Sequence, residues 1–346
     1  MVFPPEAPTG LVPSGGWHRP SSRPGPFSPT GSVPLDGAPD LRCNSVTNGG
    51  PSRRYDTVSL LTDYGNRDEF VGVVKCVIRD IAPHVGVVDL THEIAPFDVR
   101  GGSLALARCI GYVPSGVVLA VVDPDVGTDR RAVAIEVAGG AGVVIGPDNG
   151  LLAPAVAMAG GAERAVELTN PEYQLESAGL TFAGRDIFAP AAAHLCNGVA
   201  LMDLGDEVDP DVLTPGTIPL PRADGDAIVA EVLWVDRFGN CQLNVGPDDI
   251  EGLAAFKGVD RVSLRLGDPT APTGVSVRTA VRSSSFAGIG GGIGLVLDSY
   301  GMLAVCLDRH SAADELGIGS GDQIAITPLT DQTGGNGIRV TLGPTR

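Results

Sequence analysis

Residues 123–129 place carboxylates at alternating positions, a spacing that suits two kinds of chemistry. The sequence Asp-Pro-Asp-Val-Gly-Thr-Asp has the form of a calcium loop, in which several carboxylate oxygens surround the cation. A calcium loop usually carries a further carboxylate shortly downstream, but Arg130 and Arg131 follow here. The segment also comes directly after an apolar run, and α/β sheets bind ligands in the loops that follow their strands. We therefore favour a ligand-binding loop, with a calcium site as the alternative.

The elements expected to position this loop alternate between strands and helices. Helical spacing of apolar residues extends over residues 70–81 and 101–111. Apolar runs typical of buried strands lie at residues 58–62, 85–90, 117–122 and 142–145, and the pattern continues through residues 187–195. This alternation predicts parallel β–α units. We therefore expect an α/β fold class, with a mainly parallel central sheet over residues 56–205.

The pattern changes on either side of this domain. Residues 206–222 are rich in Pro and Asp and predict a linker. Residues 223–346 contain many short strand-like runs and little helix, which is typical of a small barrel or sandwich, and we expect a β-barrel domain. Residues 1–55 are crowded with Pro, Gly and Ser and lack periodicity, so they cannot bury enough apolar surface to offset their ordering entropy. We expect them to form a disordered extension.

Composition argues against several classes of function. The net charge of −17, with no basic run, argues against a nucleic-acid partner, because such binding rests on Lys and Arg neutralising phosphates. No segment reaches the roughly 18 apolar residues of a membrane span, so we expect no membrane partner. The six cysteines lie far apart without a C-x-x-C pair, which predicts free thiols in a reducing cytoplasm. The sequence also has no dinucleotide fingerprint or P-loop, and its histidines lack metal-ligand spacing.

Six short segments occur in one order along the chain and carry a family resemblance. They are Leu-Thr-Asp-Tyr-Gly at 61–65, Ile-Ala-Pro-Phe-Asp-Val at 94–99, Val-Val-Asp-Pro-Asp-Val-Gly-Thr at 121–128, Gly-Pro-Asp-Asn-Gly at 146–150, Thr-Phe-Ala-Gly-Arg-Asp at 181–186, and Asp-Arg-Phe-Gly-Asn at 236–240. Together they resemble the S-adenosylmethionine (SAM) hydrolase and halogenase family, which is fluorinase-like and includes the SAM hydroxide adenosyltransferases. The resemblance implies an α/β domain followed by a β-barrel, and a homotrimer with active sites between subunits.

The resemblance also implies a reaction, in which water or hydroxide attacks the ribose 5′-carbon of SAM and releases adenosine and methionine. The sulfonium is an excellent leaving group, so the protein needs only to bind, align and desolvate the nucleophile, and we expect no metal or cofactor. Asp123 and Arg130 match the family's catalytic pair, because a carboxylate can hold the water or accept its proton and an arginine can steady that carboxylate. An anionic Asp123 would repel halide, which favours a hydrolase. Ala183 stands where the family's hydrolases carry a histidine, so we expect slow turnover.

Further positions match the family's contacts to substrate. Asp63 matches an acid whose carboxylate accepts hydrogen bonds from both ribose hydroxyls. Asp236 matches the group that pairs with the methionine ammonium, and Ser299 matches a contact to the methionine carboxylate. The other expected substrate-binding residues are Phe97 and Phe286 as apolar walls, Phe238 and Asn240 at the adenine, Leu307 at the adenine rim through its backbone, and Gly184.

Two nearby features are expected to be structural. His92 could serve as a base, but we interpret it as a histidine with satisfied hydrogen bonds, and we expect Arg185 and Asp186 to form an ion pair. Two alternative functions stay open beside SAM hydrolysis: a halide adenosyltransferase that makes 5′-halo-adenosine, and a non-catalytic protein that binds SAM or adenosine.

Overall fold

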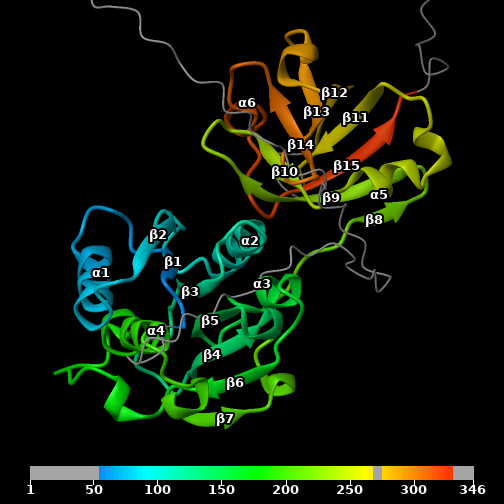
Figure 1. Ribbon diagram of the computed structural model, residues 1–346. Coiled ribbons are helices and arrows are strands. Elements are labelled where there is room, and N and C mark those ends of the chain that lie inside the picture. The colour runs from blue at the N-terminus through cyan, green and yellow to red at the C-terminus, as the bar shows by residue number, and fades with distance from the viewer. Residues whose placement is uncertain (1–53, 268–274, 330–346) are drawn as a thin grey trace, which may run out of the picture.

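The computed structural model describes residues 54–267 and 275–329 as two domains, each built on its own β-sheet (Figure 1). The extension expected over residues 1–55 lies outside the described residues, except for its last two. Those two belong to the fold: the Arg54 side chain donates a hydrogen bond to Glu136, and the buried Tyr55 donates to the Gly140 carbonyl at 3.0 Å. The folded part therefore begins earlier than the composition indicates.

The first domain is a seven-stranded sheet in the order β2-β1-β3-β5-β4-β6-β7. Strands β2, β1, β3 and β5 are parallel neighbours, and β4 runs antiparallel to both β5 and β6. The expected α/β domain with a mainly parallel sheet is therefore confirmed. The strands are β1 (Thr57–Thr62), β2 (Gly86–Thr91), β3 (Gly116–Val121), β4 (Ala132–Val137), β5 (Gly142–Pro147), β6 (Arg164–Glu167) and β7 (Asp206–Val208).

Helices cover both faces of this sheet. Helices α1 (Phe70–Ile81) and α4 (Ala189–Cys196) bury apolar side chains in one core, and α2 (Val99–Ile110) and α3 (Ala153–Met158) line the other. Helix α1 has the range that its apolar spacing predicts. Helix α2 begins two residues before the expected start, because the Asp98 side chain caps it by accepting a hydrogen bond from the Gly101 amide at 2.7 Å.

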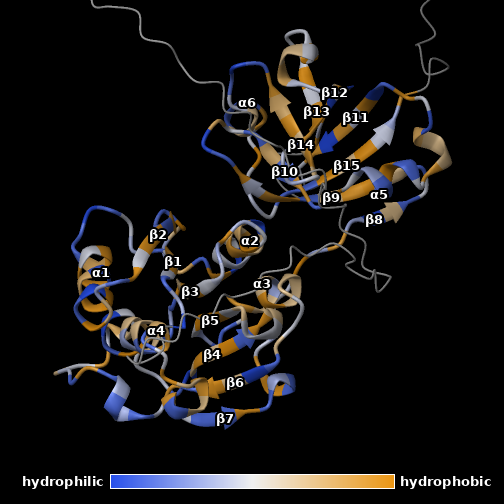
Figure 2. Ribbon diagram, in the orientation of Figure 1, coloured by the Kyte–Doolittle hydropathy of each residue, from blue (hydrophilic) through white to orange (hydrophobic). Residues whose placement is uncertain are grey.

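The second domain is a closed barrel, as expected. Seven strands follow one another in the order β10-β14-β13-β12-β11-β15-β9, and the pairing of β9 with β10 closes the ring. Apolar residues fill the interior, and Figure 2 shows hydrophobic positions alternating with polar ones along these strands. The elements are β8 (Arg222–Asp224), β9 (Ala227–Val235), β10 (Cys241–Leu243), α5 (Pro247–Glu251), β11 (Arg261–Leu266), β12 (Ser276–Ser283), β13 (Ile293–Leu297), β14 (Leu303–Leu307), α6 (Ala312–Leu316) and β15 (Gln323–Pro328).

The stretch expected as a linker, residues 206–222, is partly structured. Its first residues form β7, which pairs with β6, and its last residue begins β8, which pairs with β9. The connection between the domains is therefore shorter than the Pro- and Asp-rich composition indicates.

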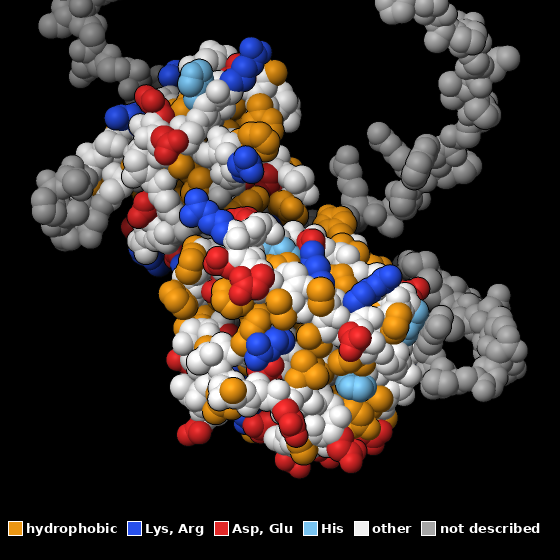
Figure 3. Space-filling model, turned by 90° about the vertical axis from the view of Figure 1, so that its left-hand side faces the viewer, with side chains coloured by type: hydrophobic (Ala, Val, Ile, Leu, Met, Phe, Trp, Pro, Cys, Tyr) orange, Lys and Arg blue, Asp and Glu red, His pale blue; other side chains and the backbone are white. Residues whose placement is uncertain are grey.

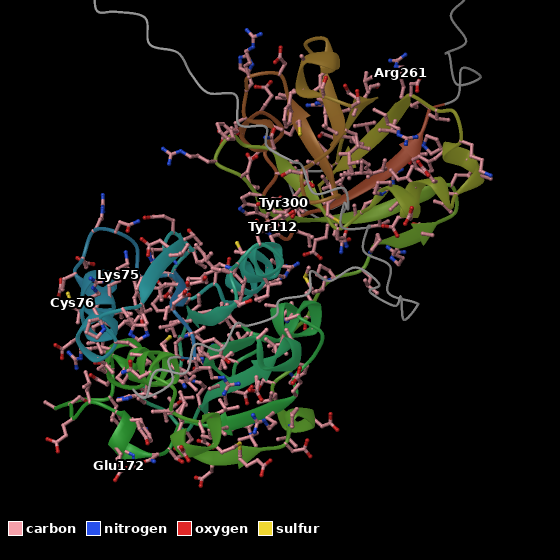
Figure 4. All side chains as sticks on the ribbon, viewed as in Figure 1. Lys75, Cys76, Tyr112, Glu172, Arg261 and Tyr300 are labelled. Carbon is pink, nitrogen blue, oxygen red and sulfur yellow. The ribbon has the colours of Figure 1, made fainter. Side chains whose placement is uncertain are left out.

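Helix α2 and strand β9 form the seam between the two domains. The guanidinium of Arg108 lies over the Trp234 ring, 4.1 Å from its centroid, and 5.9 Å from the centroid of Tyr300. Arg100, also on α2, forms an ion pair with Glu231 on β9. Figure 4 shows Tyr300 on the side of the barrel that faces α2. A stacked cation and an ion pair thus hold one orientation of the barrel on the sheet domain.

Two surface properties bear on the expected partners. Among the helices of residues 54–267 and 275–329, none combines the length and apolar character that a membrane crossing requires. Figure 3 shows acidic side chains gathered at the end of the α/β domain that points away from the barrel. This distribution agrees with the negative net charge of the sequence.

Candidate active site

Two carboxylates lie at the carboxyl edge of the parallel sheet. Strands β1 and β3 are neighbours in register, with Thr62 opposite Val121, and the pairing continues one residue further because the Asp63 amide donates to the Val121 carbonyl at 3.3 Å. Asp63 directly follows β1, and Asp123 follows β3 after one further residue. Loops at this edge are where open α/β sheets bind ligands. The structure thus brings Asp63 and Asp123 to one place.

Asp123 and Arg130 form a nearly buried, bidentate ion pair. The Arg130 Nε donates to Asp123 Oδ1 at 3.0 Å, and the terminal nitrogen donates to Oδ2. The exposed fraction of these side chains is 5% for Asp123 and 9% for Arg130. Phe188 lies under the guanidinium, 5.5 Å from ring centroid to Cζ. Two fixed hydrogen bonds hold the carboxylate in one orientation.

Burial raises the pKa of the Asp123 carboxyl above its ordinary value. The neighbouring Asp125 and Asp63 act in the same direction, and the Arg130 guanidinium opposes them. A carboxylate has about four acceptor positions, so the two that Arg130 leaves can accept hydrogen bonds from a water. Asp123 is therefore equipped to hold a water molecule and accept its proton.

The calcium alternative for residues 123–129 finds no support in this geometry. A cation would need the oxygens of Asp123, but Arg130 occupies that carboxylate. Within the described ranges, no group of three or more His, Cys, Asp or Glu side chains is placed to hold a metal ion.

The Asp63 carboxylate contacts Phe97, a residue with a strained backbone conformation. Its Oδ2 accepts a hydrogen bond from the Phe97 amide at 2.9 Å. Phe97 has φ 69°, in the left-handed region that non-glycine residues rarely adopt, and the residue is 71% exposed. Strain of this kind persists where the surroundings enforce it and is concentrated at functional sites. The expected apolar wall at Phe97 thus lies beside Asp63, open to solvent.

The buried His92 contacts Thr62 and Gly65, on either side of the Asp63 segment. Its Nδ1 lies 2.9 Å from Thr62 Oγ1, its Nε2 lies 3.0 Å from Asp89 Oδ1, and its carbonyl accepts from the Gly65 amide at 2.7 Å. The imidazole is buried and both ring nitrogens have hydrogen-bond partners, which favours the structural role over that of a base.

Ala183 and Gly184 lie at the start of a helical turn, Gly184–Phe188, that packs on the same edge. Ala183 is buried and precedes this turn, and its side chain makes no capping hydrogen bond. A Cβ on Gly184 would lie 2.4 Å from the Tyr64 hydroxyl, so a larger residue there would require the Tyr64 side chain to move. Arg185 and Asp186 form the expected ion pair, with Nε 2.6 Å from Oδ1.

Asp236, Phe238 and Asn240 meet in the turn between β9 and β10. Asp236 Oδ1 accepts from the Phe238 and Asn240 amides at 2.8 and 2.9 Å, and its Oδ2 accepts from the Asn240 side chain at 2.8 Å. Gly239 has φ 81°, and a Cβ there would lie 2.1 Å from Ser311 Oγ. The turn is therefore rigid, and it presents Phe238 as a residue that is 77% exposed.

The remaining barrel positions lie on turns and strand ends near this one. Ser299 is exposed in the turn between β13 and β14, next to Asp298, which accepts a hydrogen bond from Gln242 on β10. Phe286 begins the short turn before β13, and Leu307 ends β14. Strands β13 and β14 are neighbours, and β14 pairs with β10, so one side of the barrel carries all these residues.

The expected site residues thus form two groups, one on each domain. No hydrogen bond or ion pair within the described residues joins the group around Asp123 to the group around Asp236. The aromatic side chains expected around the nucleoside are exposed on both groups. Each group has the character of an open half-site.

The chain matches the models of two family domains, the SAM hydroxide adenosyltransferase N-terminal domain over residues 58–205 and the C-terminal domain over residues 230–325. The chain belongs to the SAM hydroxide adenosyltransferase family. This confirms the resemblance carried by the six motifs.

Three curated relatives span most of the chain. An (R)-S-adenosyl-L-methionine hydrolase of Salinispora tropica is 42% identical over 271 residues, covering 78% of this chain and 97% of the relative. The hydrolase of the same name from Thermus thermophilus is 38% identical over 273 residues, covering 76% and 96%. A fluorinase of Nocardia brasiliensis is 28% identical over 310 residues, covering 82% and 99%.

Two solved structures share the fold across both domains. An uncharacterized conserved protein from Thermotoga maritima has a TM-score of 0.70 at 32% identity, covering 78% of this chain and 99% of its own. A conserved hypothetical protein from Thermus thermophilus has a TM-score of 0.59 at 36% identity, with the same coverage.

One residue at the site of this SAM hydroxide adenosyltransferase family member was missed as a candidate. Tyr64 lies between Asp63 and Gly65, and its hydroxyl lies directly over Gly184. The signal in the sequence was a tyrosine, with a polar tip, inside a signature segment at a strand end.

Proposed function

We propose that this protein hydrolyses SAM to adenosine and L-methionine. The observation that carries the proposal is the buried Asp123–Arg130 ion pair, which presents a fixed carboxylate at the ligand-binding edge of the sheet. A carboxylate suits water as nucleophile and disfavours a halide anion. The curated hydrolases are also more similar to this chain than the fluorinase is.

The proposed reaction is an SN2 displacement. The water oxygen forms a bond to the ribose 5′-carbon while the bond from that carbon to sulfur breaks. The electron pair of the broken bond stays on sulfur, which becomes the neutral thioether of methionine. Asp123 holds the water and accepts its proton, and Arg130 keeps the carboxylate in place. Because the sulfonium leaves readily, we propose that the reaction uses no metal or cofactor.

The substrate contacts follow from the two half-sites. Asp63 would bind the ribose hydroxyls, with Phe97 against the nucleoside and Gly184 close to the reacting carbon. On the barrel, Asp236 would pair with the methionine ammonium and Ser299 with its carboxylate. The adenine would lie among Phe238, Asn240, Phe286 and the backbone at Leu307. The free thiols of the described cysteines suit a cytoplasmic location.

We further propose that three copies assemble so that the sheet edge of one copy meets the barrel of the next. The two open half-sites and their exposed aromatic side chains support this arrangement. We expect light scattering to give about three times the 35.4 kDa mass of one chain. A stable and fully active monomer would contradict it.

Mixing two inactive variants tests whether sites form between copies. Asp123→Asn damages the sheet half-site, and Asp236→Ala damages the barrel half-site. Unfolded and refolded together in equal amounts, the two should regain activity in about a quarter of the sites, because that fraction pairs two intact halves. The control is each variant refolded alone. A mixture no more active than the separate variants would place each site within one chain.

The reaction itself is tested by incubating the purified protein with SAM, with and without chloride or fluoride, and identifying the nucleoside by mass. We expect adenosine in every case. A 5′-halo-adenosine would establish a halide adenosyltransferase instead. Unchanged SAM that nevertheless binds the protein would establish a non-catalytic binding protein.

A further inference from the structure

Tyr64 places a hydroxyl group against Gly184, the residue that follows Ala183. Its Oη lies 2.4 Å from where a Cβ on Gly184 would be, so it lies directly against the backbone next to Ala183. The helical turn that Gly184 begins ends at Phe188, whose ring centroid lies 5.5 Å from the Cζ of Arg130, and Arg130 holds Asp123. The Tyr64 hydroxyl and the Asp123–Arg130 pair therefore lie against the two ends of one short turn.

Packing fixes the direction of this side chain. The Tyr64 ring lies 5.8 Å from the ring of Phe70 and 5.9 Å from that of Phe182, in tilted and edge-on arrangements. Phe182 in turn precedes Ala183. The hydroxyl is thus held in place by a rigid aromatic cluster and does not swing freely.

The hydroxyl can bind a water. No described residue forms a hydrogen bond with the Tyr64 hydroxyl. Since no fully buried side-chain polar atom of the described residues lacks a hydrogen-bond partner, this hydroxyl is not fully buried and keeps contact with solvent. Burial of the ring raises the pKa of Tyr64, and the carboxylates of Asp63 and Asp123 raise it further. The phenol therefore stays protonated and neutral, and its oxygen serves as a hydrogen-bond acceptor and donor.

We infer that Tyr64 is a further catalytic residue, whose hydroxyl orients the attacking water in place of the absent histidine at position 183. One hydrogen of the water is donated to Asp123 and the other to Tyr64 Oη, which leaves a lone pair of the water directed at the 5′-carbon. The proton passes to Asp123 as the new carbon–oxygen bond forms, and Tyr64 keeps its own proton throughout. This inference rests on the proposed hydrolase function.

The test compares Tyr64→Phe with the parent protein and with Ala183→His in a double-mutant cycle. Tyr64→Phe removes only the hydroxyl and leaves the ring to pack on Phe70 and Phe182. We expect kcat for adenosine formation to fall about tenfold, with KM changed less than about threefold, as suits one hydrogen bond made mainly in the transition state. In the Ala183→His background, Tyr64→Phe should lower kcat by about twofold or less, because an imidazole then orients the water.

The control is Tyr112→Phe, which removes a hydroxyl from a tyrosine that is 70% exposed at the end of α2, and kcat should not change. Unfolding temperatures of all variants establish that they fold. An unchanged kcat in Tyr64→Phe, or an equal loss in both backgrounds, would overturn the role of Tyr64 while leaving the hydrolase function intact. If neither the parent nor Ala183→His forms adenosine, the proposed function fails, and the role of Tyr64 fails with it.

Discussion

Restoring the imidazole by Ala183→His should accelerate SAM hydrolysis by about 10- to 10³-fold, the range for a positioned acid–base group reduced because partners are already present. Ala183 is buried at the start of the turn that faces Tyr64, and its methyl can neither donate nor accept a hydrogen bond. The gain should lie in kcat more than in KM, because it arises in the transition state. Single-turnover rates at saturating SAM measure it.

The matched control for this substitution is Ala183→Leu, which adds comparable bulk without a hydrogen-bonding group. We expect it to be no faster than the parent. If Ala183→His also brings no acceleration while the protein stays folded, the water is already fully oriented by other groups, and position 183 does not limit the rate.

Asp123→Asn should lower kcat by about 10²-fold, because the amide keeps the shape of the side chain but cannot accept the proton of the attacking water. The substitution also leaves the Arg130 guanidinium without its counter-charge, so SAM binding by isothermal calorimetry should accompany the kinetics. KM should change less than kcat. The control is Asp125→Asn, two residues along the same loop, where the side chain is exposed and kcat should stay unchanged.

The pH dependence of kcat provides an independent check on Asp123. Burial raises the pKa of this carboxyl, so its ionised form predominates only above that raised value. The rate should therefore fall as the pH is lowered through a range above the ordinary pKa of an aspartate, and Asp123→Asn should lose this acid limb. An acid limb that persists in the variant would assign it to another group. If kcat of the parent protein does not fall as the pH is lowered, Asp123 has a structural role only.

Much of the fold was predictable because local patterns and tertiary structure agree. The apolar residues of α1 recur at helical spacing, and Val71, Val74 and Ile78 are all buried on one face. Strand β4 was not predicted, although every residue in it is buried. It contains Glu136, whose charge is compensated by hydrogen bonds from Arg54 and Arg164, distant in sequence. A buried charge with remote partners leaves no sign in the local pattern.

The candidate site was likewise predictable from the sequence only in part. Asp63 and Asp123 could be placed at one edge of the sheet because both follow apolar strands, and neighbouring parallel strands end together. The bidentate contact of Arg130 with Asp123 and the position of the Tyr64 hydroxyl depend on how the loops pack. The spacing of residues in the sequence does not specify that packing. That the two half-sites meet between copies stays a prediction from the resemblance, since no local pattern relates a sheet edge to the barrel of another copy.

The stacking of Arg108 on Trp234 has a consequence at the scale of the whole assembly. In the proposed trimer each contact joins different surfaces of two copies, so every copy is rotated relative to its neighbour by the same angle. That angle depends on how the barrel is set against its own sheet domain, and the seam between α2 and β9 determines this setting. A small tilt at the seam would be repeated from copy to copy, and the ring would open into a spiral. In the proposed trimer, the contact of Arg108 with Trp234 would thus contribute to the angle on which closure of the ring depends.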